Sequence, residues 1–170
     1  MNKVVFLDRD GTLIEDIGYI SSPSKIAVKE GVFEGLLLLL DAGFKFVIIS
    51  NQSGVARRLI SENEFEQVNN AFIKTFADQA IRFESIYYCF HLPSDNCTCR
   101  KPGIDFFTEA KVKMKSGFVA GMVGDSIVDA LFAKNCEIPF YTTCDIPGHH
   151  MYANFEIIAH AILKELASVE

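Results

Sequence analysis

Short apolar runs recur along the chain, and a stretch long enough for a helix lies between one run and the next. The runs cover residues 4–7, 46–49, 86–89, 119–123 and 139–142, and their length is typical of buried strands. The stretches at 31–42, 61–79, 104–114, 127–133 and 153–167 are predicted helices. Strands that alternate with helices predict an α/β fold, in which helices cover both faces of a mostly parallel sheet.

The spacing of these elements predicts a single domain over residues 1–170, without a cap. The stretches 11–50 and 51–101 each hold one helix, one strand and the loops that join them, so neither has room for an inserted domain. A chain of 170 residues, 49% of them apolar, is long enough to bury one full core. We therefore expect a shallow site whose selectivity comes from loops.

Charge and hydropathy argue against two classes of partner. The 16 basic and 22 acidic residues give a net charge of −6, whereas a protein that binds nucleic acid needs a basic face. The longest apolar stretch, residues 36–40, is far shorter than the roughly 18 residues of a membrane helix. The first apolar run stops at Asp8 and is too short for a signal peptide. We expect a cytoplasmic monomer. The charge balance does not argue against a small phosphorylated substrate, which needs only a few local cations.

Polar motifs follow four of the predicted strands. They are DRDGT at residues 8–12, SNQ at 50–52, RKP at 100–102 and GDSIVD at 124–129. The carboxyl ends of parallel strands form one crevice, so these motifs are expected to meet there. Asp8 and Asp10 point to the same side of an extended chain, so one could attack phosphorus while the other handles the leaving-group proton. An isolated D-x-D pair is more often a solvated acidic turn.

The remaining polar residues of these motifs suit a phosphoryl group and a metal ion. Asp125 and Asp8 together offer hard oxygen ligands for Mg²⁺, and Asp129 lies one helical turn further on, where it could steady them. As a lone pair, Asp125 and Asp129 would more often be a helix cap and a surface charge. Ser50 and Lys101 supply a hydroxyl donor and a fixed positive charge, which a transferring phosphoryl group needs.

Taken in order, the four motifs closely resemble those of the haloacid dehalogenase-like hydrolase superfamily, from about Val4 to Ala133. The resemblance implies a Rossmann-like three-layer sandwich and a phospho-aspartate mechanism. Asp8 would be the nucleophile, and Asp10 the general acid and then the general base. The implied Mg²⁺ ligands are the Asp8 carboxylate, the Asp10 backbone carbonyl and Asp125, while Ser50 and Lys101 would hold the phosphoryl group.

A cysteine-rich loop at residues 89–99 indicates a second metal. It contains three thiols and one imidazole, and turn-forming residues 93–96 separate the two pairs. Such a set suits a closed structural Zn²⁺ site, although buried strand-end cysteines or an incidental disulfide are the alternatives. The four predicted Zn²⁺ ligands are Cys89, His91, Cys97 and Cys99. The metal would hold Arg100 and Lys101, which directly follow Cys99.

This loop resembles the capless branch that holds the heptose 1,7-bisphosphate 7-phosphatases and the histidinol-phosphate phosphatases. Gly18-Tyr19 and the run from Asn51 to Arg57 look like the heptose enzymes, whereas Arg58 stands where those enzymes usually carry Gly. Removal of the 7-phosphate from a sugar bisphosphate is therefore the expected activity, with histidinol phosphate as the alternative substrate. The substrate contacts that the resemblance implies are Gly18, Tyr19, Asn51, Gln52, Arg57 and Arg100.

Two further classes of function stay open from the sequence. A phosphoryl transferase could use the same phospho-aspartate, because the sequence does not identify the acceptor. A non-catalytic module that binds zinc and phosphate is the other class. The presence of Asp8, Asp10, Lys101 and Asp125 together argues against such a module, since binding alone needs no nucleophile.

Overall fold

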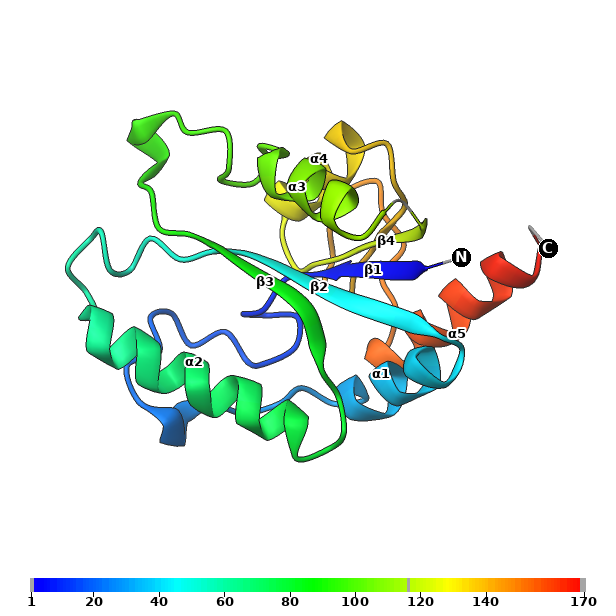
Figure 1. Cartoon of the computed structure of the whole chain (residues 1–170), viewed down its shortest axis with the longest axis horizontal. Coiled ribbons are helices and arrows are strands. Elements are labelled where there is room, and N and C mark those ends of the chain that lie inside the picture. The colour runs from blue at the N-terminus through cyan, green and yellow to red at the C-terminus, as the bar shows by residue number, and fades with distance from the viewer. Residues whose placement is uncertain (1, 116, 169–170) are drawn as a thin grey trace.

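A computed structural model describes residues 2–115 and 117–168 of the chain. Its centre is a five-stranded sheet with the order β3-β2-β1-β4-β5, in which all neighbouring strands are parallel (Figure 1). The strands are β1 (Lys3–Leu7), β2 (Phe44–Asn51), β3 (Phe83–Cys89), β4 (Phe118–Val123) and β5 (Phe140–Tyr141). All five coincide with predicted runs, so the α/β prediction is confirmed.

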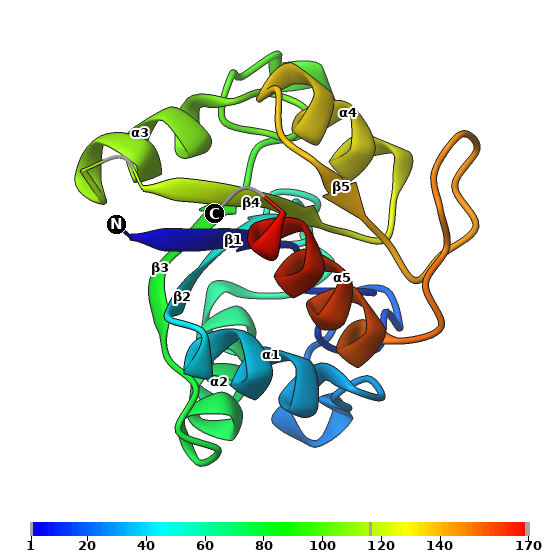
Figure 2. The ribbon, with the colours of Figure 1, turned by 90° about the vertical axis from the view of Figure 1, so that its right-hand side faces the viewer.

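Helices cover the sheet on both faces and complete three layers. They are α1 (Val32–Asp41), α2 (Glu62–Ala77), α3 (Asp105–Lys113), α4 (Ile127–Asn135) and α5 (Phe155–Ala167). Figure 2 shows α3 and α4 on one side of the sheet and α1, α2 and α5 on the other. No helix among the described residues is long and apolar enough to cross a membrane.

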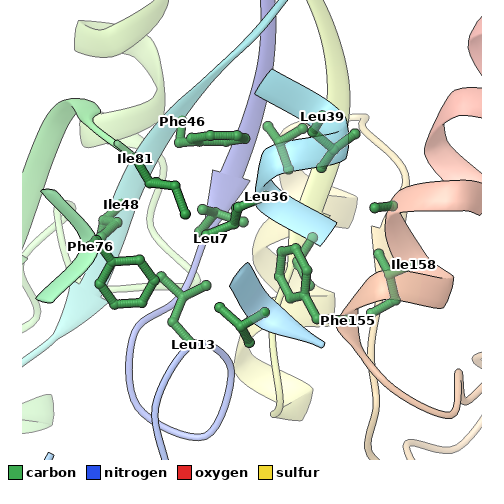
Figure 3. Close-up of a cluster of buried hydrophobic side chains, with 14 of the residues drawn as sticks. Leu7, Leu13, Leu36, Leu39, Phe46, Ile48, Phe76, Ile81, Phe155 and Ile158 are labelled. Carbon is green, nitrogen blue, oxygen red and sulfur yellow. The ribbon is translucent and has the colours of Figure 1, made fainter. Parts of the chain in front are cut away.

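Two apolar cores result from the alternation of side chains along the strands. In β1, Val5 and Leu7 belong to the core beneath α1, α2 and α5, whereas Val4 and Phe6 belong to the core beneath α3 and α4. Successive residues of a strand point to opposite faces, so an uninterrupted apolar strand must be covered on both. Figure 3 shows the larger core, to which Leu7 from β1, Leu36 from α1 and Phe155 from α5 contribute.

Side-chain capping boxes fix the starts of α2 and α4. Ser61 accepts a hydrogen bond from the Glu64 backbone N–H, and Glu64 accepts one in return, which is the predicted capping box. Ser126 and Asp129 form the same motif at the start of α4. The connections elsewhere contain only short 3₁₀ turns, at Pro23–Lys25 and Pro93–Asp95, so no cap lies over the carboxyl ends of the described strands.

Candidate active site at the carboxyl ends of the strands

The polar motifs converge at one end of the sheet, as parallel topology requires. Asp8 directly follows β1, Ser50 lies at the end of β2, and Asp125 follows β4 by two residues. The loop after β3 brings Lys101 to the same place. Together they surround a cavity of about 230 Å³. Its lining residues are Asp8, Asp10, Asp16, Ser50, Asn51, Lys101, Asp125, Ser126, Val128 and Asp129.

A buried ammonium group lies at the floor of this cavity. The Lys101 Nζ contacts Asp8 Oδ1 at 2.7 Å and Asp129 Oδ1 at 2.5 Å, and only 4% of Lys101 is exposed. Burial would lower the pKa of Lys101, but the Asp129 and Asp8 carboxylates outweigh it and raise that pKa. Burial also raises the pKa of Asp8 to about 7, although Lys101 acts to lower it. Asp8 therefore sits close to a fixed positive charge in a largely dry environment.

The carboxylates of Asp129 and Asp125, which complete this cluster, have different contacts. Asp129 uses Oδ2 to accept hydrogen bonds from the Ser126 hydroxyl (2.7 Å) and the Ser126 backbone N–H (3.2 Å), so both of its oxygens are engaged. Asp125 lies against Gly11, where an added Cβ would come within 1.9 Å of Asp125 Oδ2. Glycine at position 11, with φ of 79°, is what lets the carboxylate approach the turn. Burial, and then the charge of Asp129, raise the pKa of Asp125 to about 6.

Asp10 is held in place by two neighbours. The Arg9 guanidinium donates to both of its oxygens, through Nε at 2.9 Å and Nη2 at 3.1 Å. The Gln52 Nε2 donates to Asp10 Oδ2 at 2.6 Å and to Ser50 Oγ at 2.9 Å, while Gln52 Oε1 accepts from Arg9 at 3.1 Å. A side-chain amide has two N–H donors, so these contacts use both donors of Gln52.

Asn51 contacts protein backbone through both ends of its amide. Its Nδ2 donates to the Lys101 carbonyl at 3.1 Å, and its Oδ1 accepts from the Lys101 N–H at 3.0 Å. The paired bonds fix the backbone from which the buried ammonium extends. Asn51 also lines the cavity, so it links the end of β2 to the loop after β3.

Three carboxylates lie close enough together to hold a small hard cation. One oxygen each from Asp8, Asp125 and Asp129 lie within 4.8 Å of one another, and Asp125 is held against Gly11 as described above. Because Asp129 already accepts bonds at both oxygens, Asp8 and Asp125 are the carboxylates with coordination capacity left. All-oxygen ligand sets of this kind suit Mg²⁺.

The cysteine-rich loop brings its four predicted ligands together. The three Sγ–Sγ distances among Cys89, Cys97 and Cys99 are 3.4, 3.6 and 3.7 Å. The His91 Nδ1 lies 3.5 Å from Cys89 Sγ and 3.3 Å from Cys99 Sγ. A tetrahedral Zn²⁺ at about 2.3 Å from sulfur and about 2.0–2.1 Å from nitrogen would place neighbouring ligand atoms about 3.5–3.8 Å apart. The observed separations of 3.3–3.7 Å are close to these values, and none of the three cysteines forms a disulfide.

A second, larger depression continues from the cavity towards the cysteine-rich loop. It has a volume of about 520 Å³ and shares Asn51, Lys101 and Val128 with the first cavity. Arg100 lies in its lining, and the Arg100 Nη1 donates to the His91 carbonyl at 3.1 Å. The depression therefore offers a cation beside the cavity that holds Asp8.

Four residues expected to contact substrate lie outside both hollows, namely Gly18, Tyr19, Gln52 and Arg57. Tyr19 packs against Gly54, where an added Cβ would come within 2.5 Å of the Tyr19 ring, and its side chain is 45% exposed. Arg57 is exposed and donates to Ser53 Oγ at 3.2 Å. Among the described residues, neither these two nor Gly18 lines either hollow. Their predicted contact with substrate stays a prediction.

Sequence reasoning missed several residues of this site. Arg9 lies inside the DRDGT motif, but nothing in the pattern indicates that its side chain turns inward. Ser126 and Val128 lie inside GDSIVD, where helical spacing from Asp125 could have placed them at the cavity. Asp16 also lines the cavity and comes from an irregular loop, for which periodicity gives no signal.

Comparison with known proteins identifies the family. The family described as polynucleotide kinase 3 phosphatase matches residues 3–146. A probable D-glycero-D-manno-heptose-1,7-bisphosphate 7-phosphatase of Thermoplasma volcanium is 34% identical over 81% of the chain and 96% of its own length. The histidine biosynthesis bifunctional protein HisB of Legionella pneumophila is 35% identical over 97% of the chain. The chain spans 46% of that HisB protein.

A solved structure shows the same fold. The D,D-heptose 1,7-bisphosphate phosphatase from B. bronchiseptica, crystallised with magnesium and phosphate, superposes with a TM-score of 0.84. The match covers 96% of this chain and 99% of that protein, at 23% identity. The predicted superfamily is therefore confirmed, and the chain belongs to the polynucleotide kinase 3 phosphatase family of haloacid dehalogenase-like phosphatases.

Proposed function

We propose that this phosphatase works through a phospho-aspartate on Asp8. The observation that carries the proposal is the buried Lys101–Asp8 ion pair at 2.7 Å, on the floor of a cavity that Asp10 and Ser50 also line. The Asp8 carboxylate attacks phosphorus, the bond to the leaving oxygen breaks, and Asp10 gives that oxygen a proton. Water then attacks phosphorus, Asp10 accepts its proton, and the bond between phosphorus and Asp8 breaks.

Lys101 and Ser50 hold the phosphoryl group during both steps. Their ammonium and hydroxyl donors face the cavity that surrounds Asp8, where a low dielectric strengthens their attraction for the transferring charge. The Asp8 and Asp125 carboxylates and the Asp10 backbone carbonyl would hold Mg²⁺. When bound, this ion neutralises charge on the phosphoryl oxygens.

The substrate that the chain suits best is a sugar bisphosphate, with D-glycero-D-manno-heptose 1,7-bisphosphate the leading candidate and its 7-phosphate the group removed. The relatives that carry this name support the choice. The shape of the site supports it as well, since a second anionic group could lie in the 520 Å³ depression beside Arg100. A guanidinium binds phosphate through paired hydrogen bonds. Arg57 is a further candidate only if its exposed side chain turns towards this depression.

Histidinol phosphate is the alternative substrate. The HisB relatives match the chain nearly end to end, which is the observation in its favour. The amine and imidazole of histidinol phosphate would carry positive charge towards Arg100, so the depression suits this substrate less well than one with a second phosphate.

A structural zinc is part of the proposal. The distances within the Cys89, His91, Cys97 and Cys99 cluster support tetrahedral Zn²⁺, and all four positions are used by protein. Arg100 and Lys101 follow this cluster directly, so the metal would order the backbone that carries both cations.

We further propose that the enzyme acts as a monomer in the cytoplasm on small molecules rather than on nucleic acid or at a membrane. The family description refers to polynucleotides, but a net charge of −6 gives no electrostatic attraction to a phosphate backbone.

Phosphate release from a panel of substrates tests the proposal. The panel holds heptose 1,7-bisphosphate, histidinol phosphate, a nucleotide and an oligonucleotide with a 3′-phosphate, each with Mg²⁺ present and with Asp8→Asn as the blank. We expect the heptose substrate to exceed histidinol phosphate in kcat/KM by at least about tenfold, which corresponds to roughly 1.4 kcal/mol. Equal or faster hydrolysis of histidinol phosphate would overturn the heptose assignment, and preference for the oligonucleotide would overturn the small-molecule class.

A further inference from the structure

The Arg9 side chain is buried beneath the cavity, in a position that the proposed chemistry does not explain. Only 3% of Arg9 is exposed. A buried guanidinium is costly unless its charge is paired and hydrogen-bonded. Arg9 is paired with Asp10, to which it donates two hydrogen bonds, and its Nη2 also donates to Gln52, whereas its buried Nη1 has no hydrogen-bond partner among the described residues.

Aromatic rings surround the other side of this guanidinium. The Arg9 Cζ lies 5.9 Å from the centre of the Phe65 ring, 6.0 Å from Phe72 and 5.7 Å from Tyr88. Cations within roughly 6 Å of a ring centre are attracted to its face. These rings come from α2 and β3, so the two elements hold the guanidinium on one side while Asp10 holds it on the other.

The hydrogen bonds leave Asp10 little freedom to rotate. Its Oδ1 accepts from Arg9, and its Oδ2 accepts from both Arg9 and Gln52. The planar fork of Arg fixes a carboxylate in orientation as well as in position. Proton transfer needs the acid within hydrogen-bond reach of the leaving oxygen, and a displacement of about 1 Å can cost about a hundredfold in rate.

We propose that Arg9, held by the rings of Phe65, Phe72 and Tyr88, is a positioning residue that sets where the Asp10 carboxylate lies for proton transfer to the leaving group. Gln52 assists Arg9, since it donates to the same Asp10 Oδ2 and accepts a hydrogen bond from the guanidinium. The inference rests on the proposed role of Asp10 as general acid.

The leaving group provides the test. A nitrophenolate leaves without help from an acid, whereas an alkoxide needs a proton. The ratio kcat/KM reports the steps up to release of the alcohol, so it isolates the step in which Asp10 acts. We therefore compare nitrophenyl phosphate with an alkyl phosphate for Arg9→Met, Asp10→Asn, the double variant and the parent.

We expect Arg9→Met to lower kcat/KM for the alkyl phosphate by about tenfold to a hundredfold, which is less than the roughly 10²–10⁴-fold that acid catalysis contributes as a whole. The value of kcat/KM for the aryl phosphate should fall at least about tenfold less, because its leaving group does not need acid catalysis. In the Asp10→Asn background, Arg9→Met should have almost no further effect on the alkyl phosphate, since residues that act as a unit are not additive. If Arg9 were purely structural, Arg9→Met would lower kcat/KM equally for both substrates, and its effect would add fully to that of Asp10→Asn. That result would overturn the inference.

Two further variants keep the test decisive. Phe76→Leu alters a fully buried ring on α2 that packs beside Phe72 but does not touch Arg9 or Asp10, so it should lower stability without changing the aryl-to-alkyl ratio. If Arg9→Met does not fold, Gln52→Met removes the other donor to Asp10, and its effect on the aryl-to-alkyl ratio must also disappear in the Asp10→Asn background. A change in the aryl-to-alkyl ratio that persists in the Asp10→Asn background overturns the inference. If Asp10→Asn itself affects both substrates equally, the general-acid role fails, which is a separate result.

Discussion

Replacement of Lys101 by Met should destabilise the protein strongly near neutral pH. The Lys101 ammonium is the cation that contacts both Asp8 and Asp129, at 2.7 and 2.5 Å. Both carboxylates are buried, with 7% and 1% exposed. Met keeps the length and apolar stem of Lys but removes the charge, so the variant isolates the electrostatic contribution from packing.

The expected loss follows from the environment of the two carboxylates. Removal of one partner from a buried ion pair typically costs about 3–5 kcal/mol, because a charge is left uncompensated. That is a large part of the total stability of about 5–15 kcal/mol of an ordinary domain. Asp8 can escape part of the cost by taking up a proton, since its pKa is already raised to about 7 by burial and rises further without Lys101.

The sign of the pH dependence follows from proton binding. A carboxyl whose pKa is higher in the folded than in the unfolded state binds more protons when folded, so stability falls as pH rises towards the folded pKa. The difference in unfolding free energy between the parent and Lys101→Met should therefore be largest at about pH 8 and smaller at about pH 5.5. Mg²⁺ should recover part of it, because a ligand that binds only the folded state stabilises that state.

Urea denaturation at both pH values, with and without Mg²⁺, measures these differences. Lys134→Met is the matched control, because Lys134 is exposed on α4 and surface substitutions usually change stability by no more than about 0.5 kcal/mol. If Lys101→Met lost less than about 1 kcal/mol at pH 8 and showed no pH dependence, the carboxylates would not depend on Lys101, contrary to the energies expected of a buried pair.

Three further predictions concern the nucleophile and the two metals. Asp8→Asn should lose several orders of magnitude in turnover while circular dichroism and phosphate binding stay close to the parent, and substantial turnover in the folded variant would refute the phospho-aspartate. The purified protein should contain about one zinc per chain, and Cys97→Ser should lower zinc content and stability together, because binding to such a loop is coupled to its folding. Elemental analysis decides this, with Cys144→Ser as a control outside the cluster. Mg²⁺ should bind more tightly as pH rises from about 6 to about 8, since Asp8 and Asp125, with pKa values near 7 and 6, must lose protons to coordinate it; calorimetry that showed a constant affinity would contradict those shifts.

Local signals in the sequence determined the helices and strands of the fold and the polar residues that lie at the carboxyl ends of the strands. The uninterrupted apolar strand 4–7 predicted a sheet buried on both faces, and Ser61 with Glu64 predicted the start of α2, because both signals depend only on near neighbours along the chain. The four polar motifs predicted a shared crevice, because parallel strands have their carboxyl ends at one edge. Asp8, Ser50, Lys101 and Asp125 do meet there.

The tertiary structure decided what each of the remaining side chains contacts. The substrate contacts that the sequence suggested for Asn51 and Gln52 stay predictions, and the structure adds that their amides bond to the Lys101 backbone and to Asp10. Arg9 carried no signal at all, yet its guanidinium is enclosed by rings from α2 and β3. Such contacts join residues far apart in the chain, so they depend on the order of the strands and on how the helices pack over them, and no local pattern encodes either.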